Sequence, residues 1–259
     1  MSSEGAPTIN TQESEENLVE AFLTDEQIEA FKDTMVTSCR SFFKLDDPDD
    51  EEDHKKALDQ LPLALEREKS FCTKIINAYQ KWADEEHVDA VLWDIDETMG
   101  SYFLQTKIPD WRFRASIVPL LQFLSEKFPH IKNGILSTRD EILVRQAMIQ
   151  DDQLAPVSEY FDENMIYSSQ GLFQKIKTKD SQNGNKWHNE IKEISEKYGK
   201  DDVLLSKYSA LKKLEAQGFK MKIIDDGEIA TIVDKDGVTL GINVKDQIPM
   251  QNFLINRKA

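Results

Sequence analysis

The chain of 259 residues is long enough for one large α/β domain, or for a medium domain with an extension. Hydrophobic residues make up 39% of it, which is sufficient for a sizeable core, and the net charge is -16. The charge is uneven, since residues 1–60 carry 17 acidic but only 5 basic side chains. Neither residues 1–60 nor the rest of the chain concentrates the Lys and Arg that binding to a phosphate backbone requires, so we expect no nucleic-acid partner.

The N-terminus and the two cysteines predict the compartment. Residues 1–20 are polar and acidic, unlike a signal peptide, and no apolar run reaches the length of a membrane span. Cys39 and Cys72 have no metal-ligand spacing and fall on apolar helical faces, which favours buried, reduced thiols. We therefore predict a soluble, cytoplasmic protein. Secretion by a route that needs no N-terminal apolar signal stays open.

The first third of the chain is predicted to be a disordered tail, residues 1–14, followed by an acidic helical extension, residues 15–86. Residues 24–27 (Thr-Asp-Glu-Gln) read as a capping box, and apolar residues then recur at helical spacing. The acidic run at 46–53 is expected to break this helix as a solvated loop. A longer amphipathic helix should follow at 63–86 and pack on, or beside, a sheet.

Residues 87–259 alternate between short apolar runs and helical patterns. Strands are predicted at 90–93, 132–137, 164–168, 219–224 and 238–244. Helices are predicted at 112–128, at 187–198, from Lys207 to about 218, and after a cap at 138–141 (Thr-Arg-Asp-Glu). The short stretch between the first strand and residue 112 suits a turn and a small flap. For residues 228–233 we favour a short helix, with a hairpin as the alternative. This order predicts an α/β fold, a Rossmann-like doubly wound parallel sheet.

Polar residues stand where these strands end or where a helix begins. They are Asp94 with Asp96, Ser137, Lys207, and Asp225 with Asp226. A parallel sheet gathers the carboxyl ends of its strands along one edge, where ligands bind. Asp94 and Asp96 should point to the same side, because side chains alternate along a strand. Two acidic clusters beside one lysine favour a divalent cation, and such a site suits phosphoryl transfer through an aspartyl-phosphate.

The order and spacing of these residues resemble the four motifs of the haloacid dehalogenase superfamily in its phosphatase form. Residues 94–98 (Asp-Ile-Asp-Glu-Thr) resemble motif I, Ser137 resembles motif II, Lys207 resembles motif III, and Asp225-Asp226 resembles motif IV. The resemblance covers roughly residues 87–245. It does not extend to residues 1–86.

The resemblance implies Mg²⁺ as cofactor and a role for each residue. Asp94 would be the metal-bound nucleophile. Asp96 would protonate the leaving group and later activate water, with its backbone carbonyl on the metal. Lys207 would neutralise charge, and Asp226 would bind the metal with support from Asp225. Phosphate would be bound by Thr98 and Ser137, with Thr138 as the alternative hydroxyl of motif II.

The substrate is predicted from what covers the site. The segment between Thr98 and Ser137 is too short for a full cap domain, and the insertion at about 170–202 is smaller than the usual cap. A poorly covered site favours a phosphoprotein, on phosphotyrosine or phosphoserine/threonine. A small phosphate monoester, a phosphotransferase reaction and a non-enzymatic interaction module are the alternatives. The oligomeric state is not predicted.

Overall fold

The computed structural model describes residues 18–42, 48–103, 110–150, 154–169, 192–194, 196–197, 202–233 and 237–247. The predicted tail at 1–14 and most of the predicted insertion at 170–202 lie outside these ranges. So does most of the helix predicted at 187–198, of which residues 192–194 and 196–197 are described and are helical. Within the described ranges, no helix combines the length and the apolar character needed to cross a membrane.

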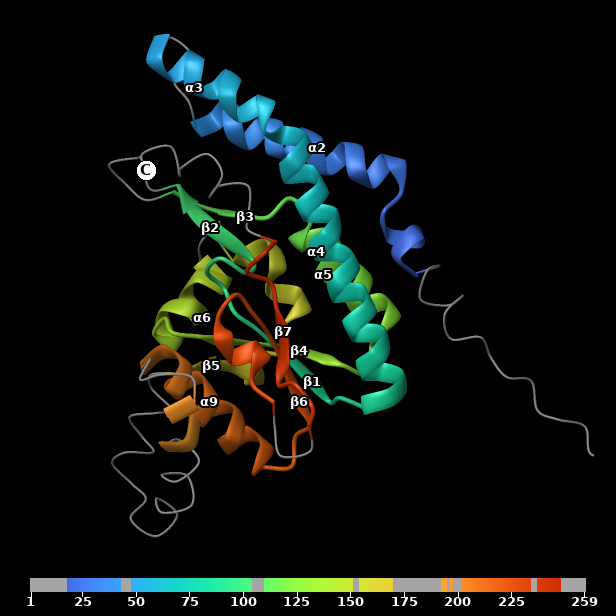
Figure 1. Ribbon diagram of the computed structural model, residues 1–259, viewed down its shortest axis with the longest axis vertical. Coiled ribbons are helices and arrows are strands. Elements are labelled where there is room, and N and C mark those ends of the chain that lie inside the picture. Colours follow the sequence, from blue (N-terminus) through green and yellow to red (C-terminus); the bar gives the residue numbers. More distant parts are fainter. Residues whose placement is uncertain are drawn as a thin grey trace, which may run out of the picture.

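A five-stranded parallel sheet forms the centre of the molecule (Figure 1). Its strand order is β5-β4-β1-β6-β7, and every neighbouring pair is parallel. The strands are β1 (Ala90–Trp93), β4 (Lys132–Ser137), β5 (Ile166–Ser168), β6 (Met221–Asp225) and β7 (Gly241–Asn243). The first strand in the chain is therefore the central one, and the α/β class and the parallel sheet predicted from the sequence are confirmed.

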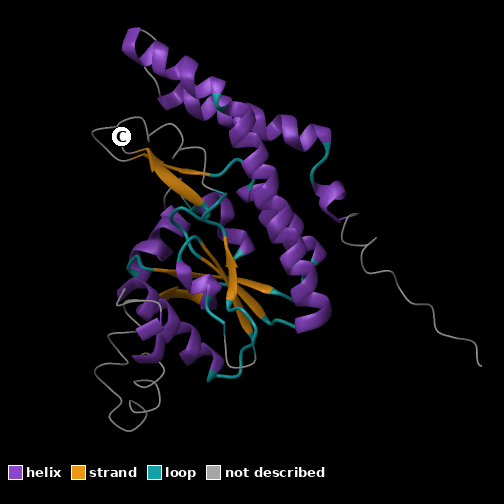
Figure 2. Ribbon diagram, viewed as in Figure 1, coloured by secondary structure: helices purple, strands orange, loops and turns teal. Residues whose placement is uncertain are grey.

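Helices cover both faces of this sheet (Figure 2). Val91 and Trp93 of β1 pack with residues of α4 (Leu61–Lys81), α5 (Ile117–Lys127) and α6 (Glu141–Gln150). The alternate residues Ala90 and Leu92 pack instead with α9 (Asp202–Glu215) and the short helix η4 (Glu228–Thr231). This alternation is expected for a strand buried on both faces, and it gives the fold its doubly wound character.

The described part of the N-terminal region includes the helices α2 (Asp25–Phe42), α3 (Pro48–Asp59) and α4, and residues 18–22 are also helical. The predicted N-cap of α2 is confirmed, since the backbone N–H of Gln27 donates to Thr24 Oγ1 at 3.2 Å, which is one of the two hydrogen bonds of a capping box. The prediction of a solvated loop over the acidic run at 46–53 is wrong for residues 48–53, which are helical. Proline is compatible with a first helical position, and acidic residues in the first turn complement the helix dipole.

The helix α4 is part of the main hydrophobic core. Its residues Phe71, Ile75 and Tyr79 are completely buried against the sheet and α5. The Tyr79 hydroxyl donates to Asn133 Oδ1 on β4, and Trp93 Nε1 on β1 donates to Tyr79 Oη at 3.0 Å. The predicted packing of the N-terminal helices on the sheet is confirmed for α4, which contacts the central strand β1 and its neighbour β4.

The segment after β1 forms an antiparallel hairpin of β2 (Gly100–Phe103) and β3 (Asp110–Phe113), in agreement with the predicted small flap. The helix predicted to start at Arg112 starts at Ile117 instead. The first residues of the predicted helix are paired with β2, so they are extended. Pro119 still falls in the first turn, where its missing N–H costs no hydrogen bond.

Three local predictions are corrected or refined in the second half of the chain. Lys207 was expected to open a helix but lies near the middle of α9, which begins at Asp202. The cap of α6 is Asp140, whose Oδ1 accepts from the N–H of Ile142 at 2.8 Å, rather than Thr138. The short helix η4 is confirmed. The hairpin alternative is also partly right, since Val233 and Thr239 form an isolated antiparallel bridge.

Candidate active site

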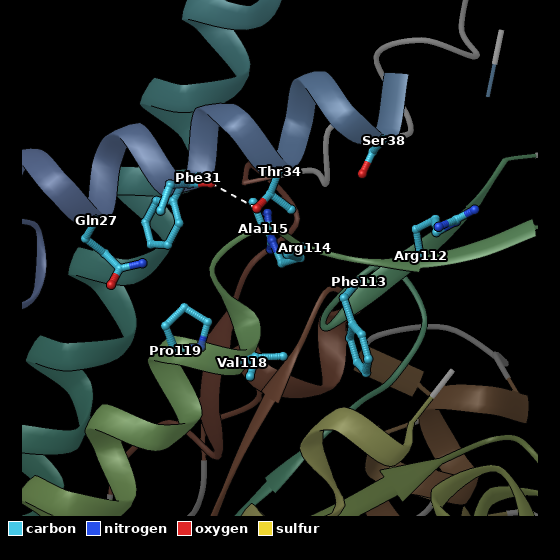
Figure 3. Close-up of a pocket in the computed structure, with 11 residues that line it drawn as sticks. Gln27, Phe31, Thr34, Ser38, Arg112, Phe113, Arg114, Ala115, Val118 and Pro119 are labelled. Carbon is cyan, nitrogen blue, oxygen red and sulfur yellow. Dashed lines mark hydrogen bonds between the residues drawn. The ribbon is translucent and has the colours of Figure 1, made fainter. Parts of the chain in front are cut away.

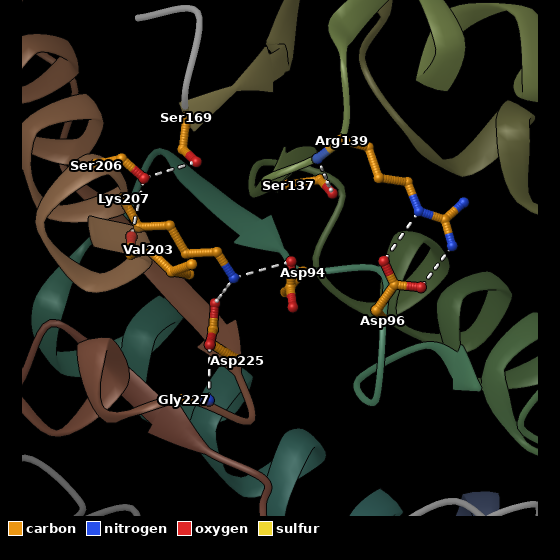
Figure 4. A network of polar contacts seen from close by, with 10 residues as sticks. All are labelled: Asp94, Asp96, Ser137, Arg139, Ser169, Val203, Ser206, Lys207, Asp225 and Gly227. Carbon is orange, nitrogen blue, oxygen red and sulfur yellow. Dashed lines mark hydrogen bonds and ion pairs between the residues drawn. The ribbon is translucent and has the colours of Figure 1, made fainter. Parts of the chain in front are cut away.

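A buried lysine joins two carboxylates at the carboxyl ends of the central strands (Figure 4). Lys207 Nζ lies 2.9 Å from Asp94 Oδ1 and 2.6 Å from Asp225 Oδ2. All three side chains are at least nine-tenths buried. The structure therefore brings Asp94 together with Lys207 and Asp225, which lie more than a hundred positions later in the chain, as the sequence predicted.

The strand pattern explains why these side chains meet. Asp94 directly follows β1, and Asp225 is the last residue of the neighbouring strand β6. Both continue the alternation of Leu92 and Ile223, which face α9. Lys207 projects from the middle of α9, where residues 204–211 are all buried and the helix is therefore covered on every side.

The electrostatics of this centre are dominated by burial. Burial raises the pKa of Asp94 to about 8, and the Asp225 charge adds to this while Lys207 opposes it. Burial also raises the pKa of Asp226 to about 6, with a further contribution from Asp225. Burial alone would lower the pKa of Lys207, but Asp94 and Asp225 together outweigh it and raise that pKa. Lys207 therefore stays charged. Its single positive charge does not balance the carboxylates around it when all of them are ionised.

The donor set fits a hard divalent cation. Asp94, Asp225 and Asp226 each offer a carboxylate oxygen, and these atoms lie within 4.8 Å of one another. When ionised, three carboxylates with one lysine leave excess negative charge in a largely buried place, which a cation would offset. Oxygen ligands of this kind are those that Mg²⁺ binds in proteins. Asp96 was predicted to offer its backbone carbonyl to the metal, and this group of side-chain carboxylates does not test that prediction.

The loop after β6 is held in place by backbone and side-chain hydrogen bonds. The N–H of Gly227 donates to Asp225 Oδ1 at 2.7 Å. Asn243 on β7 donates through Nδ2 to the carbonyl oxygens of Asp226, at 3.0 Å, and of Gly227, at 2.6 Å. These contacts orient both acidic residues of the pair before any ligand is bound.

Asp96 has a different partner from Asp94. Arg139 Nε lies 2.9 Å from Asp96 Oδ2, and its Nη2 pairs with Asp96 Oδ1. Asp94 still follows the alternation of β1, which ends at Trp93, but the chain then turns and the alternation does not extend to Asp96. The turn continues through Glu97, whose φ of 60° is left-handed. Sequence reasoning missed Arg139 as a site residue, because it assigned residues 138–141 to a helix cap.

The predicted phosphate-binding hydroxyls lie in this region with unequal access. Ser137 ends β4, is 1% exposed, and its Oγ accepts from the N–H of Arg139 at 3.1 Å. Thr138, the alternative, is half-buried. Thr98 is completely buried, and its Oγ1 has no hydrogen-bond partner among the residues that the structure describes. The Thr98 carbonyl accepts from Arg114 Nη1 at 3.3 Å, so this residue is tied into the loop.

A separate cavity of about 450 Å³ lies between α2 and the segment that joins β3 to α5 (Figure 3). Phe31, Phe113, Val118 and Pro119 line it together with polar residues such as Gln27. It includes no member of the carboxylate centre. It therefore does not change the location of the candidate site.

Comparison with known proteins gives no relative from which a function could be transferred. No protein-family model, no curated protein and no solved structure matches this chain.

Proposed function

We propose that this protein is a Mg²⁺-dependent phosphatase that works through an aspartyl-phosphate on Asp94, in the manner of the haloacid dehalogenase superfamily that the sequence resembles. The observation that carries the proposal is the contact of Lys207 with both Asp94 and Asp225. Asp226 stands within metal-sharing distance of the same carboxylates. A nucleophile, a cation site and a fixed positive charge at one sheet edge are what phosphoryl transfer requires.

The residues of the chain divide the reaction into two steps. An Asp94 carboxylate oxygen attacks phosphorus, and the bond from phosphorus to the leaving oxygen breaks as Asp96 supplies its proton. Water then attacks the aspartyl-phosphate while Asp96 takes a proton from it. The bond between phosphorus and Asp94 breaks, which releases phosphate and restores the carboxylate. Lys207 holds its charge beside Asp94 throughout.

The metal would be held by Asp94, Asp225 and Asp226, and when bound Mg²⁺ would offset charge on the phosphoryl oxygens. Cation binding requires the ionised form of Asp94, which is also the form that attacks phosphorus. The metal and the nucleophile role thus favour the same protonation state.

A phosphorylated protein is the substrate class that we favour. Between β1 and β4 the described residues form only a hairpin and α5, with no cap domain among them. A small flap leaves room for a phosphate presented on a large surface. A small phosphate monoester is the alternative substrate. A purely structural role is disfavoured, because a cluster of three carboxylates, two of them buried, is costly to keep.

The test is hydrolysis of an aryl phosphate by the purified chain, with Mg²⁺ and with a chelator. We expect activity only with metal, and a loss of about 10³-fold or more in Asp94→Asn. Asp84→Asn serves as control, since Asp84 is exposed and lies outside the site. Activity that persists without metal, or in Asp94→Asn, would contradict the mechanism.

The substrate class needs a second experiment. Peptides carrying phosphotyrosine, phosphoserine or phosphothreonine should be compared with sugar phosphates and nucleotides at equal concentration. Faster turnover of a small ester would replace the phosphoprotein proposal. Transfer of the phosphoryl group to an added alcohol, in place of water, would indicate a phosphotransferase.

A further inference from the structure

A second cation stands at the candidate site besides Lys207. The guanidinium of Arg139 spans both carboxylate oxygens of Asp96, with Nε 2.9 Å from Oδ2 and Nη2 paired with Oδ1. The two residues come from the loops that follow β4 and β1, which are neighbouring strands. This pair therefore bridges the two loops at the edge of the sheet where phosphate is expected.

The pair lies on the opposite side of Asp94 from Lys207 (Figure 4). Arg139 is also anchored beside a predicted phosphate-binding residue, since its own backbone N–H donates to Ser137 Oγ at 3.1 Å. A phosphoryl group attached to Asp94 would have Lys207 on one side and Arg139 on the other. Two flanking cations are a common way of binding a transferring phosphoryl group.

The pair is open enough to exchange partners. The side chains of Arg139 and Asp96 are 19% and 35% exposed, whereas those of Lys207 and Asp94 are 5% and 8% exposed. Because both side chains reach solvent, water screens this pair and can hydrate either partner when the pair opens. The planar fork of a guanidinium fits two phosphate oxygens as well as it fits a carboxylate.

We propose that Arg139 is a substrate-binding residue that exchanges the Asp96 carboxylate for phosphoryl oxygens when the phosphate enters. Asp96 holds the guanidinium ready in the absence of substrate. The exchange also releases the Asp96 carboxylate, which takes up a proton from solvent before it supplies one to the leaving group. This inference deepens the proposed phosphatase function and rests on it for the identity of the anion.

The experiment measures binding of orthophosphate by calorimetry at saturating Mg²⁺, so that it does not depend on turnover. Arg139→Met should weaken binding on the order of tenfold, because a charge-assisted fork is lost. Asp96→Asn should strengthen binding about two- to fivefold, because the competing carboxylate is removed. The double variant should lose that gain, since the gain acts through Arg139.

Arg145→Met is the matched control. Arg145 also forms an ion pair, with Glu141 at 3.1 Å on α6, and it donates to the Glu163 carbonyl. It should leave orthophosphate binding unchanged. Arg139→Lys keeps the charge without the planar fork and should give intermediate orthophosphate binding. This variant provides the test if Arg139→Met does not fold.

Two results would overturn the inference. One is an Asp96→Asn gain that is equally large with Met at position 139, which would indicate simple charge repulsion. The other is unchanged binding in both Arg139 variants. Hydrolysis is measured in parallel. Turnover by the unmodified chain without dependence on Arg139 rejects this inference alone, whereas coupled anion binding without turnover rejects only the phosphatase function.

Discussion

Arg114 Nε lies 3.3 Å from a carboxylate oxygen of Glu68, and both side chains are almost completely buried. Glu68 belongs to α4, while Arg114 follows β3 and donates to the carbonyl oxygen of Thr98 in the loop after β1. The second Glu68 oxygen accepts from the N–H of Ser116 at 3.0 Å. One ion pair thus links the N-terminal helices to the loop that carries Asp94.

Replacing Glu68 by Gln should destabilise the protein strongly, because Arg114 would remain charged and buried without its partner. We expect the free energy of unfolding to fall by about 3 kcal/mol, measured by urea denaturation. Glu66→Gln is the control, since Glu66 pairs with Lys69 at the surface. It should change the value by less than about 0.5 kcal/mol. Equal losses of unfolding free energy in the two variants would show that the buried pair contributes no more to stability than the surface pair.

Stabilisation by Mg²⁺ should increase with pH. The folded pKa values of about 8 for Asp94 and about 6 for Asp226 exceed the ordinary value of 3.8. Without metal, the stability that these two groups contribute is therefore complete below about pH 4 and is lost as pH rises through 6 and 8. Mg²⁺ must displace their protons, so it binds more tightly at the upper end of this range.

The measurement for this prediction is the shift in melting temperature on adding Mg²⁺, at about pH 6 and about pH 8. The shift should be larger at the higher pH. Asp94→Asn should reduce it at both, because one metal ligand is lost. A shift that does not change with pH would contradict the assignment of the cation to these carboxylates.

Glycine should be better than alanine at position 97. Glu97 has a φ of 60°, a left-handed conformation that side chains with a Cβ adopt at a cost. We expect Glu97→Gly to be more stable than Glu97→Ala by about 1 kcal/mol in urea denaturation. The comparison removes the Glu97 carboxylate in both variants, so it isolates the backbone.

Glu126 provides a comparison of opposite sign. It is exposed in the helix α5, where alanine should be the more stable choice by about 1 kcal/mol. If alanine is also preferred at position 97, the loop after β1 relaxes its left-handed turn at no cost.

Both thiols should be unreactive in the folded protein. Burial raises the pKa of Cys39 to about 11 and raises that of Cys72 further, and both residues are completely buried. A disulfide reagent at about pH 8 should label neither thiol until a denaturant is added, when both should react. Rapid labelling of the native protein would contradict the packing of Cys39 between α2, α3 and α4.

Several parts of the fold could be predicted because their signal is local. The apolar runs of β1, β4 and β6 are bounded by polar residues, and parallel pairing then gathers Asp94, Asp225 and Lys207 at one edge. The residues at which helices begin were harder to predict from the sequence. The start of α5 depends on pairing of β3 with β2, and the start of α9 depends on residues before Lys207 that carry little periodicity.

The contacts that were missed all join distant residues. Arg139 and Asp96 are 43 positions apart, and nothing in the residues around Arg139 distinguishes a site cation from a surface charge. Glu68 and Arg114 are 46 apart, and each has the sequence context of an ordinary exposed residue. In both cases folding brings the partner in from a distant part of the chain, so only the structure could reveal the contact.

Trp93 makes the protein convenient to study by optical methods. It directly precedes Asp94, is completely buried, and its indole N–H donates to Tyr79 at 3.0 Å and Asn133 at 3.2 Å. A change in charge or position at Asp94 should alter the emission of this indole. Stopped-flow fluorescence can therefore follow metal and phosphate binding without any added label, with Trp93→Phe identifying its share of the signal among the four tryptophans.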